Sequence, residues 1–335
     1  MSHRDLLCAA ILLAGAPAAP VASTPTGLAA AQDANFLLPV AAIEEALRGG
    51  ELEVIDVRPS RGLPGERTYR VTLQSGGQVL QIKYAPAREG ADEFNNRPRY
   101  ELAAYAIQGL FLDEREWVVP PTAIRVLPLD VVRATVARSG DAANPPERTF
   151  AEWPMTLVAL QYWLFNVDVP DELEDRDRLA EDEVYERLLG NFNLFTYLIR
   201  HSDSNQGNFV QSLDPDWPRV FSVDNGVAFS SEESDRGTRW RELRLDRYPA
   251  SAIERLRDLS LEGLQARLGV LVQLELRDGN FVEVEPTENL DPGRGVRHDG
   301  ARIQLGLTDA EIRNIHRRVV RLLEWVDDGR YGLIP

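Results

Sequence analysis

Cysteine, histidine and lysine are all scarce in this chain of 335 residues. Cys8 is the single cysteine and there are four histidines, so neither a disulfide framework nor a cage of thiolate and imidazole ligands is expected. The chain also lacks an apolar run long enough to span a bilayer well, since the best candidate covers only residues 6–15. We therefore expect no transmembrane span in the mature chain.

Positive charge is in short supply as well. The formal net charge is −16 at pH 7, which argues against a surface that neutralises nucleic-acid phosphates, so no nucleic-acid partner is expected. The hydrophobic fraction of 44% is high enough for a large buried core. This length fits one bilobal domain or two ordinary ones.

The first residues have the order of a secretory signal peptide. Arg4 precedes the apolar stretch 6–15, and an Ala/Pro-rich segment follows with small residues at positions that permit cleavage, 16–18 and 29–31. We expect residues 1–31 to be a signal peptide or leader and the mature protein to be periplasmic or secreted. A retained, disordered leader is the alternative.

Lys83 is the only lysine, so 37 − 1 = 36 of the basic residues are arginine. Arginine replaces lysine on most solvated surfaces, but its planar fork cannot replace a compact ammonium that sits between phosphates and a carboxylate. Either Lys83 remains by chance on a surface strand, or its chemistry requires an ammonium.

The residues around Lys83 predict a β-hairpin followed by a helix. Residues 67–73 and 78–84 alternate polar and apolar side chains around a glycine turn, which places Lys83 near the end of the second strand. Residues 99–108 have the composition and apolar face of a helix, with Glu101 in its first turn. A strand lysine followed by a helix glutamate is the arrangement by which kinases hold a lysine against nucleotide phosphates.

A polar loop follows the next predicted helix, which covers residues 181–200. The loop 201–208 fits the pattern H-x-D-x-x-x-x-N, in which Asp203 accepts the proton of the attacking hydroxyl and Asn208 binds a metal that bridges the nucleotide phosphates. The alternative interpretation is an ordinary cap and turn.

Asp224 ends a short apolar strand, 219–223, and begins the sequence Asp-Asn-Gly. An aspartate at this place suits an oxygen-ligated cation such as Mg²⁺, although Asp-Asn-Gly alone also fits a hairpin turn. The order of strand lysine, helix glutamate, polar loop and strand-terminal aspartate is harder to obtain by chance than any one motif.

On these motifs the chain resembles atypical kinases: phosphatidylinositol 4-kinase type II, the four-jointed-like secretory-pathway kinases and the bacterial HipA-type kinases. The resemblance extends from about residue 51 to the C-terminus. Its most specific segments are 101–105, 118–122, 199–209 and 223–229.

The resemblance implies a role for each matching residue. Lys83 would hold the phosphates and Glu101 would pair with it, Asp203 would be the catalytic aspartate, and Asn208 and Asp224 would hold Mg²⁺ or Mn²⁺. Residues 157–164 would form the strand and hinge against the adenine of ATP, with three nucleotide-binding residues: Gln161, Tyr162 and Trp163.

Three positions depart from the family pattern. Residues 61–67 contain two glycines but no G-x-G-x-x-G, so the loop that would cover the phosphates is in question. Ser204 follows the catalytic aspartate where relatives often carry a basic residue. Ser202 stands where ordinary protein kinases have arginine, which argues against control by a phosphorylated activation loop.

The remaining segments predict elements but no further site. Residues 168–186 are rich in acidic residues and form either a solvated insertion or a docking surface for a basic substrate. Residues 271–285 predict a second hairpin. Residues 293–300 form a basic loop, and Thr308 with Glu311 forms a capping box that opens a last amphipathic helix.

We predict an α+β, bilobal protein-kinase-like fold. A small lobe of sheet plus one helix would cover residues 35–126, and the hinge and a larger, mainly helical lobe would cover residues 127–335. The expected function is transfer of the γ-phosphate of ATP to a hydroxyl of an exported protein, a lipid or a small molecule.

Three alternatives remain open from the sequence. A pseudokinase would bind nucleotide or a partner without catalysis, and a nucleotidyltransferase would use the same fold for another reaction. Aminoglycoside-phosphotransferase-like enzymes share the loop pattern, but the later Asp-Asn-Gly and the segment 118–122 fit them less well.

Overall fold

The computed structural model describes residues 33–60, 67–92, 97–140, 144–229 and 237–335. The predicted leader with Cys8, and all but one residue of the glycine-containing segment 61–67, lie outside these ranges. The described residues form a mixed α+β structure, as predicted.

Five antiparallel strands form the larger sheet, in the order β1-β2-β3-β5-β4. They are β1 (Glu53–Pro59), β2 (Tyr69–Ser75), β3 (Gln78–Pro86), β4 (Thr122–Pro128) and β5 (Met155–Tyr162). The hairpin predicted around Lys83 is confirmed as β2 and β3. Because β5 lies between β3 and β4, this sheet crosses the boundary at residues 126 and 127 that we predicted between the lobes.

Side chains alternate between the two faces of this sheet along each strand, and along β2 one face is buried while Arg70 and Gln74 on the other are exposed. One face packs on α1 (Val40–Arg48) and α3 (Leu129–Ala137) in a core that includes Ile82 and Leu160. The other face packs on α2 (Pro98–Gln108). Lys83 and Gln161, direct partners across β3 and β5, lie on this second face.

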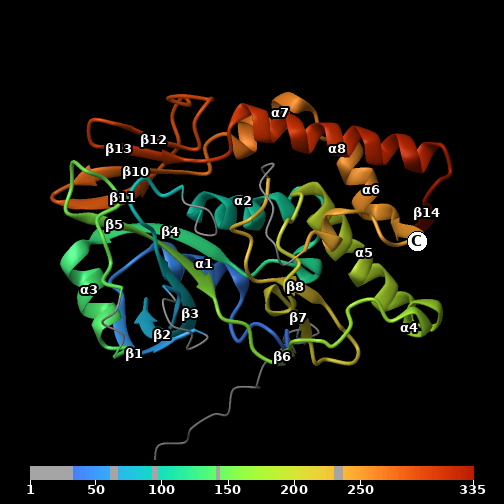
Figure 1. Cartoon of the computed structure of the whole chain (residues 1–335), viewed down its shortest axis with the longest axis horizontal. Coiled ribbons are helices and arrows are strands. Elements are labelled where there is room, and N and C mark those ends of the chain that lie inside the picture. The colour runs from blue at the N-terminus through green and yellow to red at the C-terminus, as the bar shows by residue number, and fades with distance from the viewer. Residues whose placement is uncertain (1–32, 61–66, 93–96, 141–143, 230–236) are drawn as a thin grey trace, which may run out of the picture. The chain divides into compact units, whose positions relative to one another are not determined.

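A second antiparallel sheet packs against the end of the same face. Its order is β11-β10-β13-β12, and its strands are β10 (Val272–Arg277), β11 (Asn280–Val284), β12 (Val296–Asp299) and β13 (Arg302–Leu305). The hairpin predicted over 271–285 is confirmed, with Asp278 and Gly279 at positive φ in its turn. Figure 1 shows this sheet beside α2 and the larger sheet.

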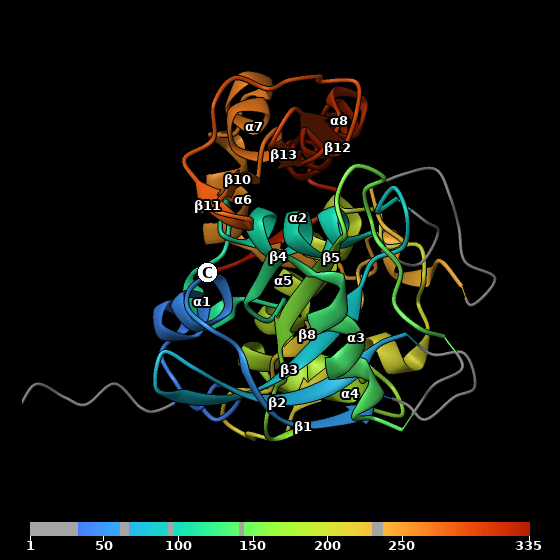
Figure 2. The same ribbon diagram turned by 90° about the vertical axis from the view of Figure 1, so that its left-hand side faces the viewer.

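The remaining helices share one apolar core with α2. They are α4 (Arg176–Glu181), α5 (Glu183–Leu198), α6 (Ala250–Arg257), α7 (Leu261–Leu268) and α8 (Asp309–Asp327). The predicted helix 181–200 is confirmed as α5, whose N-cap Asp182 accepts a hydrogen bond from the Tyr185 N–H. The predicted last helix is α8, and Figure 2 shows it close to α7.

Short strands complete the chain. β6 (Val167–Asp168), β7 (Phe209–Ser212) and β8 (Val220–Ser222) form a three-stranded sheet, and β14 (Gly332–Ile334) pairs with β9 (Arg247–Pro249) in parallel. None of the helices in the described ranges has the length and apolar character needed to cross a bilayer.

Candidate functional site

Lys83 contacts Glu101, as the sequence predicts. The Nζ atom of Lys83 lies 3.0 Å from Glu101 Oε1 and donates a second hydrogen bond, of 3.1 Å, to the carbonyl oxygen of Val223. Burial raises the pKa of Glu101, while the neighbouring Lys83 ammonium acts in the opposite direction. The larger sheet, α2 and the segment after β8 therefore meet at this one amine.

Asn225 is a site residue that we did not identify from the sequence. Its backbone N–H donates to Glu101 Oε2 at 3.2 Å, and its side-chain amide oxygen accepts a bond from Ser222 Oγ at 2.7 Å. Asn225 is fully buried. The Asp-Asn-Gly sequence contained the signal, because a buried asparagine beside a metal-binding aspartate can fix the turn that presents it.

The polar loop begins where α5 ends. Arg200 adopts a positive φ of 52°, a left-handed conformation that turns the chain out of the helix. His201 follows, fully buried; its Nδ1 accepts the N–H of Asp203 at 3.4 Å, and its Nε2 lies 3.0 Å from the carbonyl oxygen of Asp224. His201 thus ties the loop that carries Asp203 to the loop that carries Asp224.

These two contacts indicate which ring nitrogen of His201 carries the hydrogen. Because Nδ1 accepts a hydrogen bond, the ring hydrogen lies on Nε2 and donates to Asp224 O. Burial lowers the pKa of His201, so the ring is neutral at pH 7. A neutral ring satisfies both contacts at once.

One carboxylate oxygen of Asp203 has a notable environment. The residue is 6% exposed, and its Oδ1 atom is buried and has no hydrogen-bond partner among the described residues. A buried polar atom of this kind normally costs stability. Such an atom is available for a hydrogen bond from a ligand or substrate group.

Asn208 holds the end of the same loop. Its side-chain Nδ2 donates to the carbonyl oxygen of Asp203 at 3.2 Å, and its own carbonyl accepts the N–H of Val223 at 2.9 Å. These bonds place Asn208 between Asp203 and the residue before Asp224. The structure thus brings together the catalytic and metal-binding residues predicted from separate motifs.

Asn208 and Asp224 are the residues that could hold Mg²⁺ or Mn²⁺. The Asp224 side chain is 34% exposed and its Oδ1 lies 3.7 Å from Lys83 Nζ. No group of three or more His, Cys, Asp or Glu side chains in the described ranges could hold a metal alone. The donors present fit a hard cation whose remaining ligands are phosphate oxygens and water, which is how Mg²⁺ is usually bound beside nucleotides.

The three predicted nucleotide-binding residues do not lie together. The Gln161 side chain is on the Lys83 face and donates to Thr122 Oγ1 at 3.1 Å. The Tyr162 side chain is on the opposite face, where it packs on Phe36 in the core and accepts the N–H of Leu37. The period of two along β5 separates Gln161 from Tyr162, so the Tyr162 ring does not take part in the candidate site.

Trp163 follows β5 and stays near the second face. The guanidinium of Arg70 lies 4.9 Å from the centre of its ring, a cation–π contact. Its backbone N–H donates to Gln81 O at 2.8 Å, so this segment is fixed to β3, two residues from Lys83.

The two serines that depart from the kinase pattern have internal roles. Ser204 Oγ accepts the N–H of Trp240 at 3.1 Å, and the Ser204 N–H donates to Gly237 O. Ser202 Oγ donates to Arg200 O at 3.0 Å. Ser204 therefore fixes the segment around Trp240 against the polar loop.

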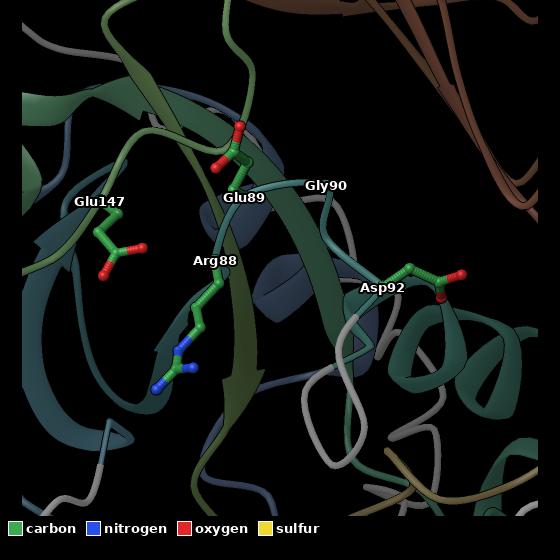
Figure 3. Close-up of a pocket in the computed structure, with 5 residues that line it drawn as sticks. All are labelled: Arg88, Glu89, Gly90, Asp92 and Glu147. Carbon is green, nitrogen blue, oxygen red and sulfur yellow. The ribbon is translucent and has the colours of Figure 1, made fainter.

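A hollow of about 350 Å³ lies away from these residues and is lined by Arg88, Glu89, Gly90, Asp92 and Glu147. In Figure 3 the side chains of Arg88 and Glu89 point in opposite directions, and that of Asp92 points away from both. They do not converge on one point, so this hollow presents no ligand-binding group of the kind that surrounds Lys83.

The chain has a likeness among solved structures but no sequence relative among family models or curated proteins. No protein-family model and no curated protein matches the chain. Among solved structures, the chain is similar to the crystal structure of a Helicobacter pylori proinflammatory kinase, CtkA, with 12% sequence identity, coverage of 83% of this chain and 93% of that chain, and a TM-score of 0.26. At these values the functional argument rests on the contacts within the chain.

Proposed function

We propose that this chain is a kinase-like phosphotransferase with a bilobal, protein-kinase-like fold, which uses ATP with Mg²⁺ or Mn²⁺. The observation that carries the proposal is the ion pair of Lys83 and Glu101, whose side chains are 16% and 10% exposed, next to Asp224. Two carboxylates and the carbonyl oxygen of Val223 therefore surround one ammonium.

Each residue has a defined task in the proposed reaction. The Lys83 ammonium, oriented by Glu101, binds phosphate oxygens of ATP. Asp203, through its unpartnered oxygen, accepts the proton of the acceptor hydroxyl. Asn208 and Asp224 would hold the metal, which would supply positive charge beside the phosphates. Gln161 and Trp163 lie on the face where the base would bind.

The acceptor is a hydroxyl of a protein, a lipid or a small molecule, and the predicted leader supports a periplasmic or secreted location. A pseudokinase is the second candidate. Ser204 favours it, because its hydroxyl is bound to the Trp240 N–H and brings no positive charge to the phosphoryl group. A nucleotidyl transfer is distinguished from a phosphoryl transfer by the mass of the product.

The first test is thermal unfolding with and without ATP and Mg²⁺ or Mn²⁺. A ligand that binds only the folded state at about 100 times its Kd stabilises that state by about 2.7 kcal/mol. We expect this for the wild type and not for Lys83→Arg or Asp224→Asn, which preserve size or charge but not the ligand geometry.

Asp56→Asn is the matched control, because Asp56 forms an exposed ion pair with Arg58 on β1. It should retain the full effect of ATP. A wild type that binds neither nucleotide nor metal overturns the proposal. Binding without transfer of labelled phosphate from ATP supports the pseudokinase.

A further inference from the structure

A buried ion pair joins α2 to α8, 212 residues apart in sequence. The Arg99 guanidinium donates from Nη1 to Glu311 Oε2 at 2.7 Å and from Nη2 to Glu311 Oε1 at 3.0 Å. The side chains of Arg99 and Glu311 are 4% and 10% exposed. Two parallel bonds between planar groups fix orientation as well as distance.

Glu311 is itself held in place by the first turn of α8. Its Oε2 accepts the N–H of Thr308 at 2.8 Å, and its own N–H donates to Thr308 Oγ1 at 3.3 Å, which completes a capping box. The Tyr100 hydroxyl also donates to Glu311. The carboxylate that receives Arg99 is therefore part of the helix terminus.

Arg99 is enclosed on its other sides. Its Nε donates to Asp92 Oδ1 at 3.0 Å. A Cβ atom placed on Gly295 would lie 2.3 Å from Arg99 Nε, so glycine is required for the close approach of this loop. Arg99 thus has one position, and it is set by α8 and the segments around it.

Arg99 stands two residues before Glu101 in the first turn of α2. At about 100° per residue the two side chains leave the helix about 200° apart, so Arg99 meets α8 while Glu101 meets Lys83 and Asn225. A rotation of α2 that released Arg99 would also displace Glu101.

We propose that Arg99 and Glu311 are positioning residues, which hold α2 in the rotation that places Glu101 against Lys83. The C-terminal helix thereby determines whether the Lys83 ammonium is held for phosphate binding. This catalytic consequence rests on the proposed function, whereas the effect on Lys83 itself does not.

The test uses Lys83 as a built-in probe, since it is the only lysine. A soluble acyl donor is added without nucleotide, well below the unfolding midpoint, and acylation of Lys83 is followed by peptide mass spectrometry, which separates it from the N-terminal amine. In the wild type the Nζ atom of Lys83 is held against Glu101 and the carbonyl oxygen of Val223, which restricts its approach to an acyl donor. Release from Glu101 therefore raises the acylation rate.

Glu311→Gln is the informative variant, because glutamine also completes a capping box but does not form the ion pair. We expect it to raise the acylation rate of Lys83 by about two- to thirtyfold, the range of such couplings. Glu101→Gln gives the upper reference. Asp327→Asn removes another ion pair of α8, with Arg257, and should leave the rate unchanged.

Thr308→Ala separates positioning from general loosening, because it weakens the cap of α8 and leaves Glu311 and Arg99 in place. If it raises the rate as much as Glu311→Gln, or if Glu311→Gln matches the wild type while Glu101→Gln does not, the inference is overturned. If Glu311→Gln fails to fold, Tyr100→Phe takes its place, because it removes one donor to Glu311. Its acylation rate at Lys83 is then compared with that of Thr308→Ala.

The inference and the proposed function fail separately. A raised acylation rate in Glu311→Gln with no ATP binding by the wild type supports the positioning role and rejects the kinase. If the wild type binds ATP and the acylation rate in Glu311→Gln is unchanged, the kinase proposal is supported and the positioning role is rejected.

Discussion

At the scale of single residues, Asp203 is buried, and its Oδ1 has no hydrogen-bond partner in the part of the chain that the structure describes. Leaving a buried acceptor unsatisfied costs about 1–3 kcal/mol. The surrounding bonds, from Asn208 to its carbonyl and from its N–H to His201, hold the backbone and leave the carboxylate oxygen for another molecule. Sites that keep such groups give up stability for function.

Replacing Asp203 therefore separates stability from activity. We expect Asp203→Asn to leave the free energy of unfolding unchanged or to raise it by up to about 1 kcal/mol, while transfer of labelled phosphate from ATP falls by about 10²- to 10⁴-fold. Chemical denaturation and the transfer assay measure the two effects. Asp182→Asn is the control, because asparagine also caps a helix. A large loss of stability in Asp203→Asn would mean that the carboxylate is structural.

At the scale of elements, α2 contacts more of the molecule than its own sequence indicates. Most of its residues are buried, and the two ends of its first turn are bound to α8 and to the segment after β8. Burial alone would raise the pKa of Glu311, but bonds from Arg99, Tyr100 and the Thr308 N–H more than offset this, and its pKa lies below the ordinary value.

The lowered pKa of Glu311 makes the stability of the fold depend on pH. A carboxyl group whose pKa is lower in the folded state stabilises the fold above its unfolded pKa, near 4.5, and the stabilisation is lost as the pH falls through the folded value. We expect Glu311→Gln to lower the free energy of unfolding by about 3–5 kcal/mol at pH 7, with the difference shrinking below about pH 4.5. Denaturant titrations from pH 7 to pH 3 measure this, and a difference that is constant with pH would contradict it.

Elements with local signals were predictable. Residues that are close together in the sequence determine three of these features: the glycine turn between β2 and β3, the cap of α5 and the capping box of α8. The pairing of Lys83 with Glu101 followed from the scarcity of lysine and the order of motifs. The strand order around β5 and the contact of Arg99 with Glu311 join residues that are far apart in the chain. A single sequence does not show which distant strands or helices pair with each other.

The same limit applies to single site residues. Asn225 was visible in its motif, but its contact with Glu101 required the fold. Tyr162 was predicted with its neighbours because the segment was assigned as a unit, and the alternation along β5 places its ring on the other face.

At the scale of the whole molecule, arginine and lysine have different tasks. Arg219, 1% exposed and just before β8, binds Asp33 through Nη2. Arg99, 4% exposed, donates to the two oxygens of Glu311 from two nitrogens of its planar guanidinium. A compact ammonium cannot make such paired bonds. The one lysine stands in the middle of the larger sheet, bonded on both sides through β2 and β5.

This placement makes a lysine-specific protease a reporter of unfolding. Cleavage can occur only after Lys83 and yields a C-terminal fragment of 335 − 83 = 252 residues. A residue in a central strand reaches a protease only when the sheet opens, so the cleavage rate follows the population of opened molecules. ATP with Mg²⁺ at about 100 times its Kd should slow cleavage by about 100-fold.

The control is Asp224→Asn, in which nucleotide should not slow cleavage. If ATP raises the unfolding midpoint of the wild type without slowing cleavage, then β3 opens by itself and the sheet is not one cooperative unit. If cleavage is slowed in proportion to the gain in stability, the strand that carries Lys83 opens only with the rest of the molecule. The nucleotide site and the fold would then be stabilised together.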